Sequence, residues 1–258
     1  MMVESVLIFS PIGAVLLLAL LSDVHANIEA LTACLEHARA SGATRYAFLG
    51  DLVGYGADPQ DVVDTIKRHA ASGAVVVKGN HEAALDSSTA DMSDPAALAI
   101  EWTRTQLSEE ARAWLRALPL CVRDGDLFFV HASADQPERW EYVESAAAAE
   151  RSTAAAGTPW VFSGHVHDQT LYFQTLPAKM GTFRPFPGSI VPVPRHRRWL
   201  AIVGSAGQPR DRSPNAAYAL FDLSREAITF HRVPYNAASA ASKMRAAGLI
   251  DVLSRSTR

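Results

Sequence analysis

The sequence AVLLLALLSDVHANIEALTACLEHARASG, residues 14–42, predicts a strand that is followed directly by a helix. The apolar run from Ala14 to Leu21 is typical of a buried strand, and it ends in a polar turn at Asp23. The next residues place apolar side chains three and four positions apart as far as Gly42, which indicates an amphipathic helix. A strand joined in this way to a helix favours a parallel sheet with polar groups at the carboxyl end of the strand.

The same alternation continues downstream. RYAFLGD at 45–51 and GAVVVKGN at 73–80 predict two further strands. Between them, DPQDVVDTIKRH predicts a helix with Asp58 as its N-cap and Pro59 in its first turn. This βαβαβ order favours parallel strands with right-handed crossovers.

The rest of the chain predicts more helices and shorter strands. Residues 94–118 are expected to form two helices or one broken helix that restarts at Ser108. After His167 we expect a second sheet of mostly antiparallel pairs and a last helix from Ala237. Before His167 we expect a strand at 126–133, a helix at 145–157 and a strand at 158–167. After it we expect strands at 170–176, 198–204, 216–223 and 227–234.

Composition indicates one globular domain over residues 1–258, because 48% of the 258 residues are hydrophobic. Residues 6–21 have the apolar character of a signal anchor, but no Lys or Arg precedes them and Pro11 interrupts them. We therefore interpret residues 1–13 as an extension outside the core and expect no membrane partner. The two cysteines, Cys34 and Cys121, are expected to be buried thiols of a cytoplasmic protein.

Net charge argues against a partner made of long nucleic acid. The formal charge is -3 at pH 7, so the chain has no broad basic field. The basic cluster at 195–198 is a local exception.

Polar residues end each of the principal predicted strands. Taken singly, each of these polar residues has an ordinary structural explanation. Asp23 can cap a helix, for example, and Asn80 can form a turn. Several together predict one crevice at the carboxyl ends of the strands. The candidates are Asp23, His25, Asp51, Asn80, His81, His131, His165 and His167.

This set suggests two metal ions. Without His81, the set consists of two Asp, one Asn and four His. These are more than the four ligands of a closed zinc site, and none of them is a thiolate. Asp51 is the expected bridge between ions roughly 3.5–4 Å apart. Mixed nitrogen and oxygen donors suit divalent first-row metals, with Mn as our first expectation and Fe, Zn, Co or Ni as alternatives.

The ordered motifs DVH, GD, GNHE, VH and GHVH resemble those of the calcineurin-like metallophosphoesterase superfamily. The resemblance covers Leu16 to His167 and extends through VGSAGQPRD to Asp211. It implies an α/β fold: a four-layer α/β/β/α sandwich of two mixed sheets flanked by helices, with a dinuclear metal site at the strand ends. It also implies two ligand sets, namely Asp23, His25, Asp51 and His167 for one ion, and Asp51, Asn80, His131 and His165 for the other.

The resemblance further implies hydrolysis of phosphodiester or phosphoanhydride bonds by a hydroxide that bridges the metals. His81 would protonate the leaving oxygen or steady the transition state, and Asp51 would hold both ions. Glu82 has two interpretations, orientation of its loop or a plain surface carboxylate.

GDLVGYG has Gly54 and Tyr55 where protein phosphatases of this superfamily carry Asp and Arg. The chain is more similar to phosphodiesterase-like bacterial members, some of which resemble asymmetric hydrolases of dinucleoside polyphosphates. Alternatives are a phosphomonoesterase or protein phosphatase, a nuclease, and a nonenzymatic metal-binding partner subunit. A small phosphorylated substrate is expected, and a nucleotide is one candidate.

Expected substrate contacts are Asn27, Tyr55, Gln208 and Arg210, with a stacking face for a base from Tyr55, Trp140 and Tyr142. Gln208 and Arg210 have a structural turn as their alternative. Apolar strands in the second half would permit a homodimer.

Overall fold

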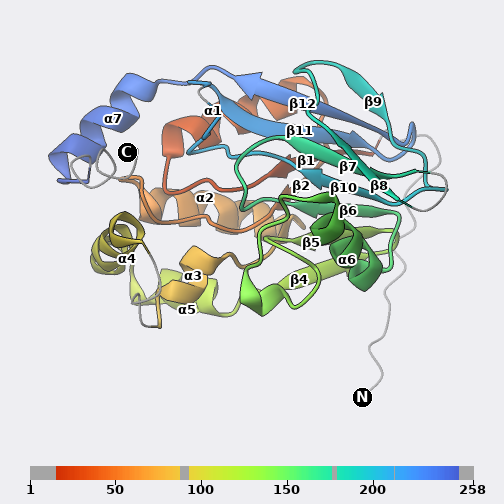
Figure 1. Cartoon of the computed structure of the whole chain (residues 1–258). Coiled ribbons are helices and arrows are strands. Elements are labelled where there is room, and N and C mark those ends of the chain that lie inside the picture. The colour runs from red at the N-terminus through yellow and green to blue at the C-terminus, as the bar shows by residue number, and fades with distance from the viewer. Residues whose placement is uncertain (1–15, 88–92, 176–178, 212, 250–258) are drawn as a thin grey trace.

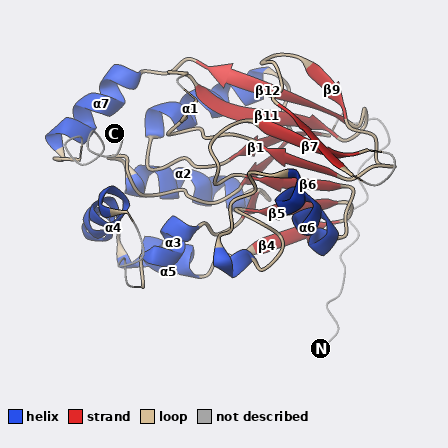
Figure 2. Cartoon of the chain, in the orientation of Figure 1, coloured by secondary structure: helices blue, strands red, loops and turns tan. Residues whose placement is uncertain are grey.

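The computed structural model describes residues 16–87, 93–175, 179–211 and 213–249, which form two six-stranded sheets with helices around them (Figures 1 and 2). The first sheet has the order β3-β2-β1-β11-β12-β9 and the second β4-β5-β6-β10-β7-β8. The strands of the first sheet are β1 (Leu17–Leu21), β2 (Arg45–Phe48), β3 (Val75–Val76), β9 (Ile190–Pro192), β11 (Ala216–Asp222) and β12 (Ala227–Val233). Those of the second are β4 (Cys121–Asp124), β5 (Leu127–Val130), β6 (Trp160–Ser163), β7 (Thr170–Gln174), β8 (Met180–Phe183) and β10 (Trp199–Ile202).

Seven α-helices occur in the described residues, and in Figure 2 the strands gather at the right while α3, α4, α5 and α7 lie at the left. Helix α6 lies in front of the second sheet (Figure 1) and contacts β6, β8 and β10. The helices are α1 (Ile28–Ala40), α2 (Pro59–Ala71), α3 (Asn80–Ala84), α4 (Asp94–Gln106), α5 (Glu109–Arg116), α6 (Ala146–Ala156) and α7 (Ala237–Ala246).

Three hydrophobic cores lie between four layers. Strand β1 shows how, because its side chains alternate between two faces: Ala19 and Leu21 pack in the core with α1 and α2, whereas Leu18 and Leu20 pack between the sheets. A third core joins the outer face of the second sheet to α6. The expected α/β/β/α sandwich of two mixed sheets is therefore confirmed.

The predicted allocation of strands to sheets was wrong. β5 and β6 lie in the second sheet, and the strands after His167 are divided between both sheets instead of forming one of their own. β10 pairs in parallel with β6, whereas β11 pairs antiparallel with β1. Apolar patterning marks a strand as buried, but its pairing partner is set by distant contacts, so local sequence does not distinguish the two sheets.

Several local predictions were right and others need correction. α5 begins after Ser108, whose side chain accepts a hydrogen bond from Ala111 N. Asp58 is the N-cap of α2, yet its carboxylate makes no capping bond and accepts one from Lys243 Nζ at 2.7 Å instead. Cys34 is buried, whereas Cys121 is only half-buried in β4.

The proposed extension at 1–13 lies outside the described residues. Across the parts of the chain that the structure describes, no helix has the length and apolar character needed to cross a membrane.

A pH-dependent contribution to stability is expected from His231, whose ring stacks on Tyr218 at 5.1 Å and lies 5.0 Å from that of His37. Burial, and then the charge of His37, lowers the pKa of His231 to about 4. The unfolded chain binds a proton at His231 more tightly than the folded protein does. The contribution of His231 to the free energy of unfolding is therefore fully present above about pH 6.5 and is lost as the pH falls toward 4.

The test compares wild type with His231→Phe, since His231 Nε2 is buried without a hydrogen-bond partner among the described residues. Between pH 7 and 4.5 the variant should lose less free energy of unfolding than wild type, by on the order of 1 kcal/mol after allowance for solvent screening. Urea unfolding of both proteins across this range measures the difference, and parallel curves would contradict the assignment.

Candidate metal centre

The candidate ligands lie on loops that follow strands of both sheets. Asp23 and His25 follow β1 and Asp51 follows β2 in the first sheet, while His131 follows β5 and the His165 loop follows β6 in the second. These ends meet because β1 and β2 are parallel to one another, as are β5, β6 and β10. The site therefore lies where the carboxyl ends of strands from two sheets converge.

Backbone hydrogen bonds fix the loops to one another. Asp23 N donates to Gly50 O at 3.0 Å, and His25 N donates to Asp51 O at 2.9 Å. Across the two sheets, His165 N donates to Asp23 Oδ2 at 3.0 Å. The glycine before His165 is required here, because a Cβ on Gly164 would overlap the side chains of Ser22 and Asp23. The close approach of the sheets therefore depends on that residue.

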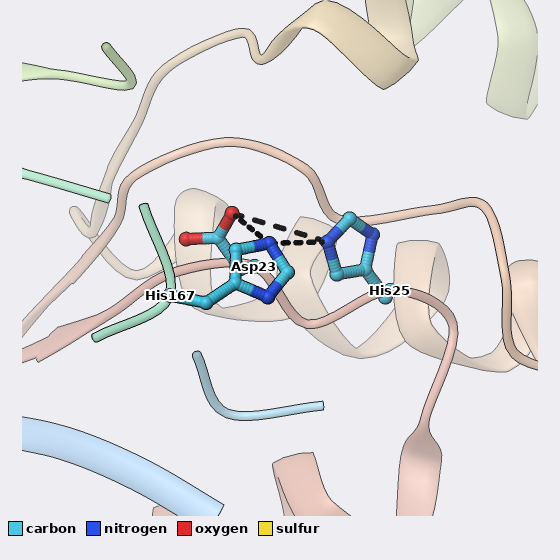
Figure 3. A group of neighbouring side chains, drawn as sticks. All are labelled: Asp23, His25 and His167. Carbon is cyan, nitrogen blue, oxygen red and sulfur yellow. Dashed lines mark hydrogen bonds and ion pairs between the residues drawn. The ribbon is translucent and has the colours of Figure 1, made fainter. Parts of the chain in front are cut away.

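One group of candidate ligands consists of Asp23, His25 and His167 (Figure 3). His167 Nε2 lies 3.1 Å from Asp23 Oδ1 and 3.2 Å from His25 Nε2. His25 Nε2 lies 3.9 Å from Asp23 Oδ1. All three side chains are almost completely buried.

A second group consists of Asp51, His131 and His165, with Asn80 beside them. His131 Nε2 lies 3.1 Å from both His165 Nδ1 and Asn80 Oδ1, and 3.4 Å from Asp51 Oδ2. The same Asp51 oxygen lies 3.8 Å from His25 Nε2 of the first group. Asp51 thus stands between the groups, and the GHVH turn directs one imidazole to each.

Each histidine in the two groups has its other ring nitrogen on a backbone carbonyl. His131 Nδ1 lies 2.7 Å from Leu49 O and His167 Nδ1 lies 2.6 Å from Gln208 O. The remaining pairs are His165 Nε2 with Trp140 O at 3.0 Å and His25 Nδ1 with Val53 O at 3.4 Å. A carbonyl only accepts, so each outer nitrogen donates, and in the neutral form of each ring the lone pair of the inner nitrogen faces the site.

These residues fit divalent cations. With its proton directed at Gln208, the neutral ring of His167 presents a lone pair to Asp23 Oδ1, a buried oxygen without a hydrogen-bond donor among the described residues. Two lone pairs 3.1 Å apart in a buried site need a cation between them. The inner atoms of His131, His165 and Asn80 converge in the same way.

Protonation states agree with this fit. Burial opposes ionisation of Asp51, but His131 and His81 hold its pKa well below the usual value. Burial lowers the pKa of His25, and with the charge of His131 it lowers that of His165 to about 3. Ligands must be ionised carboxylates and neutral imidazoles, and these groups meet that condition.

His131 differs from the other histidines. Burial lowers its pKa, but Asp51 and Asp23 outweigh burial and raise it to about 9. Two buried carboxylates therefore attract one positive charge to His131, and a metal ion would supply that charge in place of the proton.

Backbone strain concentrates at the site. Ten non-glycine residues in the described parts of the chain have positive φ, and five are candidate ligands: Asp23, His25, Asp51, His165 and His167. L-residues rarely adopt this conformation, which costs of the order of 1–3 kcal/mol each and persists only where surrounding contacts enforce it. In these strained turns the side chains of the five candidate ligands point into the same site.

Glu82 orients the loop after β2, which excludes the surface interpretation. Its side chain is only 1% exposed. Its carboxylate accepts backbone hydrogen bonds from Asp51 N at 2.9 Å, Leu52 N at 2.8 Å, Val53 N at 3.2 Å and Gly79 N at 2.8 Å. The motif GNHE thus ties the loop of Asn80 to the loop of Asp51.

His81 lines the cavity, and its ring lies 4.8 Å from that of His25. Its Nε2 is 3.8 Å from Asp51 Oδ2, close enough for His25, Asp51 and His81 to form a further possible metal-binding group. Its Nδ1 is buried without a partner among the described residues. Gly54, at φ +87, leaves room for the ring, since a Cβ there would overlap His81 Nδ1.

A cavity of ≈ 460 Å³ opens beside these groups. Asp51, Asn80, His81, His165 and His167 line it on the metal side, and Tyr55, Trp140, Tyr142 and Arg210 line it with small side chains of Ala83, Ala84, Ser87, Ser93 and Ala96. Tyr142 stacks on the ring of His165 at 3.9 Å. The sequence did not predict these small side chains as part of the site, because no sequence pattern links them to a function.

Two expected substrate contacts lie elsewhere. Asn27 caps α1 by accepting from Ala30 N at 3.0 Å and donates to Gly207 O at 3.0 Å, which uses both ends of its amide. Gln208 is also outside the lining of the cavity in the described residues, although its carbonyl holds His167. Tyr55 and Arg210 do line the cavity.

Comparisons with known proteins agree on one family. A family model for the calcineurin-like phosphoesterase superfamily domain matches residues 16–226. An uncharacterized protein of Methanocaldococcus jannaschii is 30% identical over 234 residues, which cover 88% of this chain and 91% of that protein.

Two solved structures share the architecture. A metallophosphoesterase from Sphaerobacter thermophilus has 34% sequence identity and a TM-score of 0.81 over 93% of this chain and 98% of its own. A hypothetical protein from Pyrococcus horikoshii, with 20% identity, has a TM-score of 0.73 over 91% of this chain and 94% of its own, which shows a common fold.

Proposed function

Since this chain belongs to the calcineurin-like phosphoesterase superfamily and is a phosphoesterase, we propose that it is a two-metal hydrolase of phosphodiester or phosphoanhydride bonds. The observation that carries the proposal is the pair of buried ligand groups that share Asp51, with the inner ring nitrogen of each histidine directed into the site. A single ion would leave one of the two groups without a cation.

Asp23, His25, Asp51 and His167 would hold one ion, and Asp51, Asn80, His131 and His165 the other. When bound, the two ions would lower the pKa of a shared water and neutralise charge on the phosphate oxygens. Mn²⁺ is the first metal to test. Fe²⁺, Zn²⁺, Co²⁺ and Ni²⁺ are the alternatives, because they suit the same donor set.

Hydrolysis forms one bond between the water oxygen and phosphorus and breaks the bond from phosphorus to the leaving oxygen. The leaving oxygen needs a proton, and His81 is the imidazole in the cavity whose outer nitrogen is not held by a backbone carbonyl. We assign His81 as the proton donor to that oxygen.

The substrate we propose is small and of nucleotide type, with asymmetric cleavage of dinucleoside polyphosphates as the specific case to test. Three aromatic side chains line the cavity, Tyr55, Trp140 and Tyr142, which supports a planar group in the substrate. The alternatives have less support. Tyr55 stands where a protein phosphatase would carry arginine, and the complete ligand set argues against a nonenzymatic subunit.

A nuclease for long strands is also less favoured, because the basic cluster at 195–198 precedes β10, at the opposite end of the strand from the site. Arg195 there is paired with Glu226 at 2.6 Å. Binding to a nucleic-acid backbone would need several free cations along one groove.

The test is turnover of bis(p-nitrophenyl) phosphate and diadenosine tetraphosphate by protein stripped of metal and refilled with Mn²⁺. We expect about two ions per chain by elemental analysis, no turnover after chelation, and recovery on refilling. ATP and AMP as products would establish asymmetric cleavage. Full turnover by the chelated protein, or saturation at one ion per chain, would reject the two-metal proposal.

A further inference from the structure

Arg210 is an exposed cation at the cavity that no carboxylate neutralises in the described parts of the chain. Its side chain lines the cavity together with Tyr55 and Tyr142, and its Nη2 lies 3.5 Å from Gln208 Oε1. Burial raises the pKa of both tyrosines, so their hydroxyls are neutral at pH 7 and leave the charge of the guanidinium intact. The cation thus remains available to an anion in the cavity.

The residue next to Arg210 is acidic, yet it is paired elsewhere. Asp211 accepts hydrogen bonds from Arg232 of β12, with Arg232 Nη1 3.3 Å from Oδ1 and Nη2 in contact with Oδ2. The side chains of Arg232 and Asp211 are only 12% and 19% exposed. Arg232 thus forms an ion pair with Asp211, the acidic residue that directly follows Arg210 in the chain.

We propose that Arg210 binds a non-bridging oxygen of the substrate phosphate, and that Arg232 is a positioning residue that keeps Asp211 from neutralising it. This inference rests on the proposed function. It also explains how the site presents an arginine although Tyr55 stands where protein phosphatases carry one. The loop after β10 brings Arg210 into the same cavity as Tyr55. Guanidinium is suited to this task because it presents two parallel donors to phosphate oxygens.

The competing explanation is that Arg210 only braces the two tyrosines and that Arg232 only stabilises its own loop. The two explanations differ in one respect. If Arg232 acts by restraining the charge of Asp211, its loss is harmful only while Asp211 is charged. If Arg232 acts as a brace, removing the charge of Asp211 does not restore function.

The experiment compares wild type, Arg210→Ala, Arg232→Met and the double variant Asp211→Asn/Arg232→Met in the Mn²⁺-loaded protein. The readouts are kcat and KM for bis(p-nitrophenyl) phosphate and the Kd for inorganic phosphate by calorimetry. Arg195→Met is the matched control, since it removes an arginine from the ion pair with Glu226 at the far end of β10.

Arg210→Ala should lower kcat/KM by roughly tenfold to hundredfold, as expected for a hydrogen bond to a charged group. Arg232→Met should raise KM and the phosphate Kd by about tenfold, within the usual range of such couplings, with little change in kcat. The double variant should return both to within about threefold of wild type, and Arg195→Met should leave both unchanged.

Unchanged KM in Arg232→Met, or a defect that the double variant retains, would overturn the inference about Arg232. Unchanged KM and Kd in Arg210→Ala would overturn the phosphate contact itself, and this exposed position tests it even if Arg232→Met unfolds. Failure of the proposed function looks different: wild type would bind phosphate with the predicted dependence on Arg210 but would not turn over the diester.

Discussion

Replacing Asp51 with asparagine should abolish two-metal binding and lower turnover by roughly a thousandfold or more, since a bound ion supplies several kcal/mol of transition-state stabilisation. Asp51 Oδ2 lies 3.4 Å from His131 Nε2 and 3.8 Å from His25 Nε2, between the two ligand groups. The substitution removes the only negative charge that both ions would share. Elemental analysis should therefore show one ion per chain or fewer, and steady-state assays should show residual activity near background.

The fold itself should survive this change. Asp51 Oδ1 accepts from His81 N at 3.0 Å, and an asparagine oxygen retains that bond. Burial and the charge of Asp51 oppose ionisation of Asp23, although His167 holds its pKa below the usual value, so removing Asp51 relieves repulsion between buried carboxylates. Metal-free Asp51→Asn should therefore remain folded, but two bound ions should no longer raise its unfolding temperature. Two ions per chain with wild-type turnover would show that Asp51 is no bridge.

Replacing His81 with alanine should lower kcat by about a hundredfold to ten-thousandfold on substrates with poor leaving groups, the range of general acid catalysis. His81 lines the cavity, and its Nε2 lies 3.8 Å from Asp51 Oδ2. Its role depends on the leaving oxygen. An ester of p-nitrophenol, whose anion is stable in water, should lose far less activity than a nucleoside ester.

The same variant separates the two possible roles of His81. As a proton donor it leaves both ions in place, so His81→Ala should still hold two per chain. As a ligand within the group of His25, Asp51 and His81, it would take an ion with it when removed. Equal losses on good and poor leaving groups, together with one ion per chain, would assign His81 as a ligand. Glu82→Gln is a useful companion because it loosens the loop without touching the cavity, and so should act equally on both ester types.

The order of the motifs, the type of their residues and their positions after buried strands were predictable from the sequence. Asp23, Asp51 and His131 each follow an apolar run whose period and composition are local properties. A polar residue directly after such a run lies at the strand's carboxyl end wherever that strand is in the sheet. The parallel order of β1, β2 and β3 could be predicted for the same reason, because each crossover contains its own helix or turn signals.

The tertiary structure alone decided which sheet each later strand joins, because pairing depends on contacts between residues far apart in the chain. It also decided that backbone carbonyls of Leu49, Trp140 and Gln208 orient the ligand imidazoles, and a carbonyl is present at every residue and so leaves no mark in sequence. For the same reason no pattern shows that Asp211 is paired with Arg232, while Arg210 has no carboxylate partner in the described residues. Local chemistry thus identified the candidate ligands, whereas the partners that orient them and set their charge are determined by long-range packing.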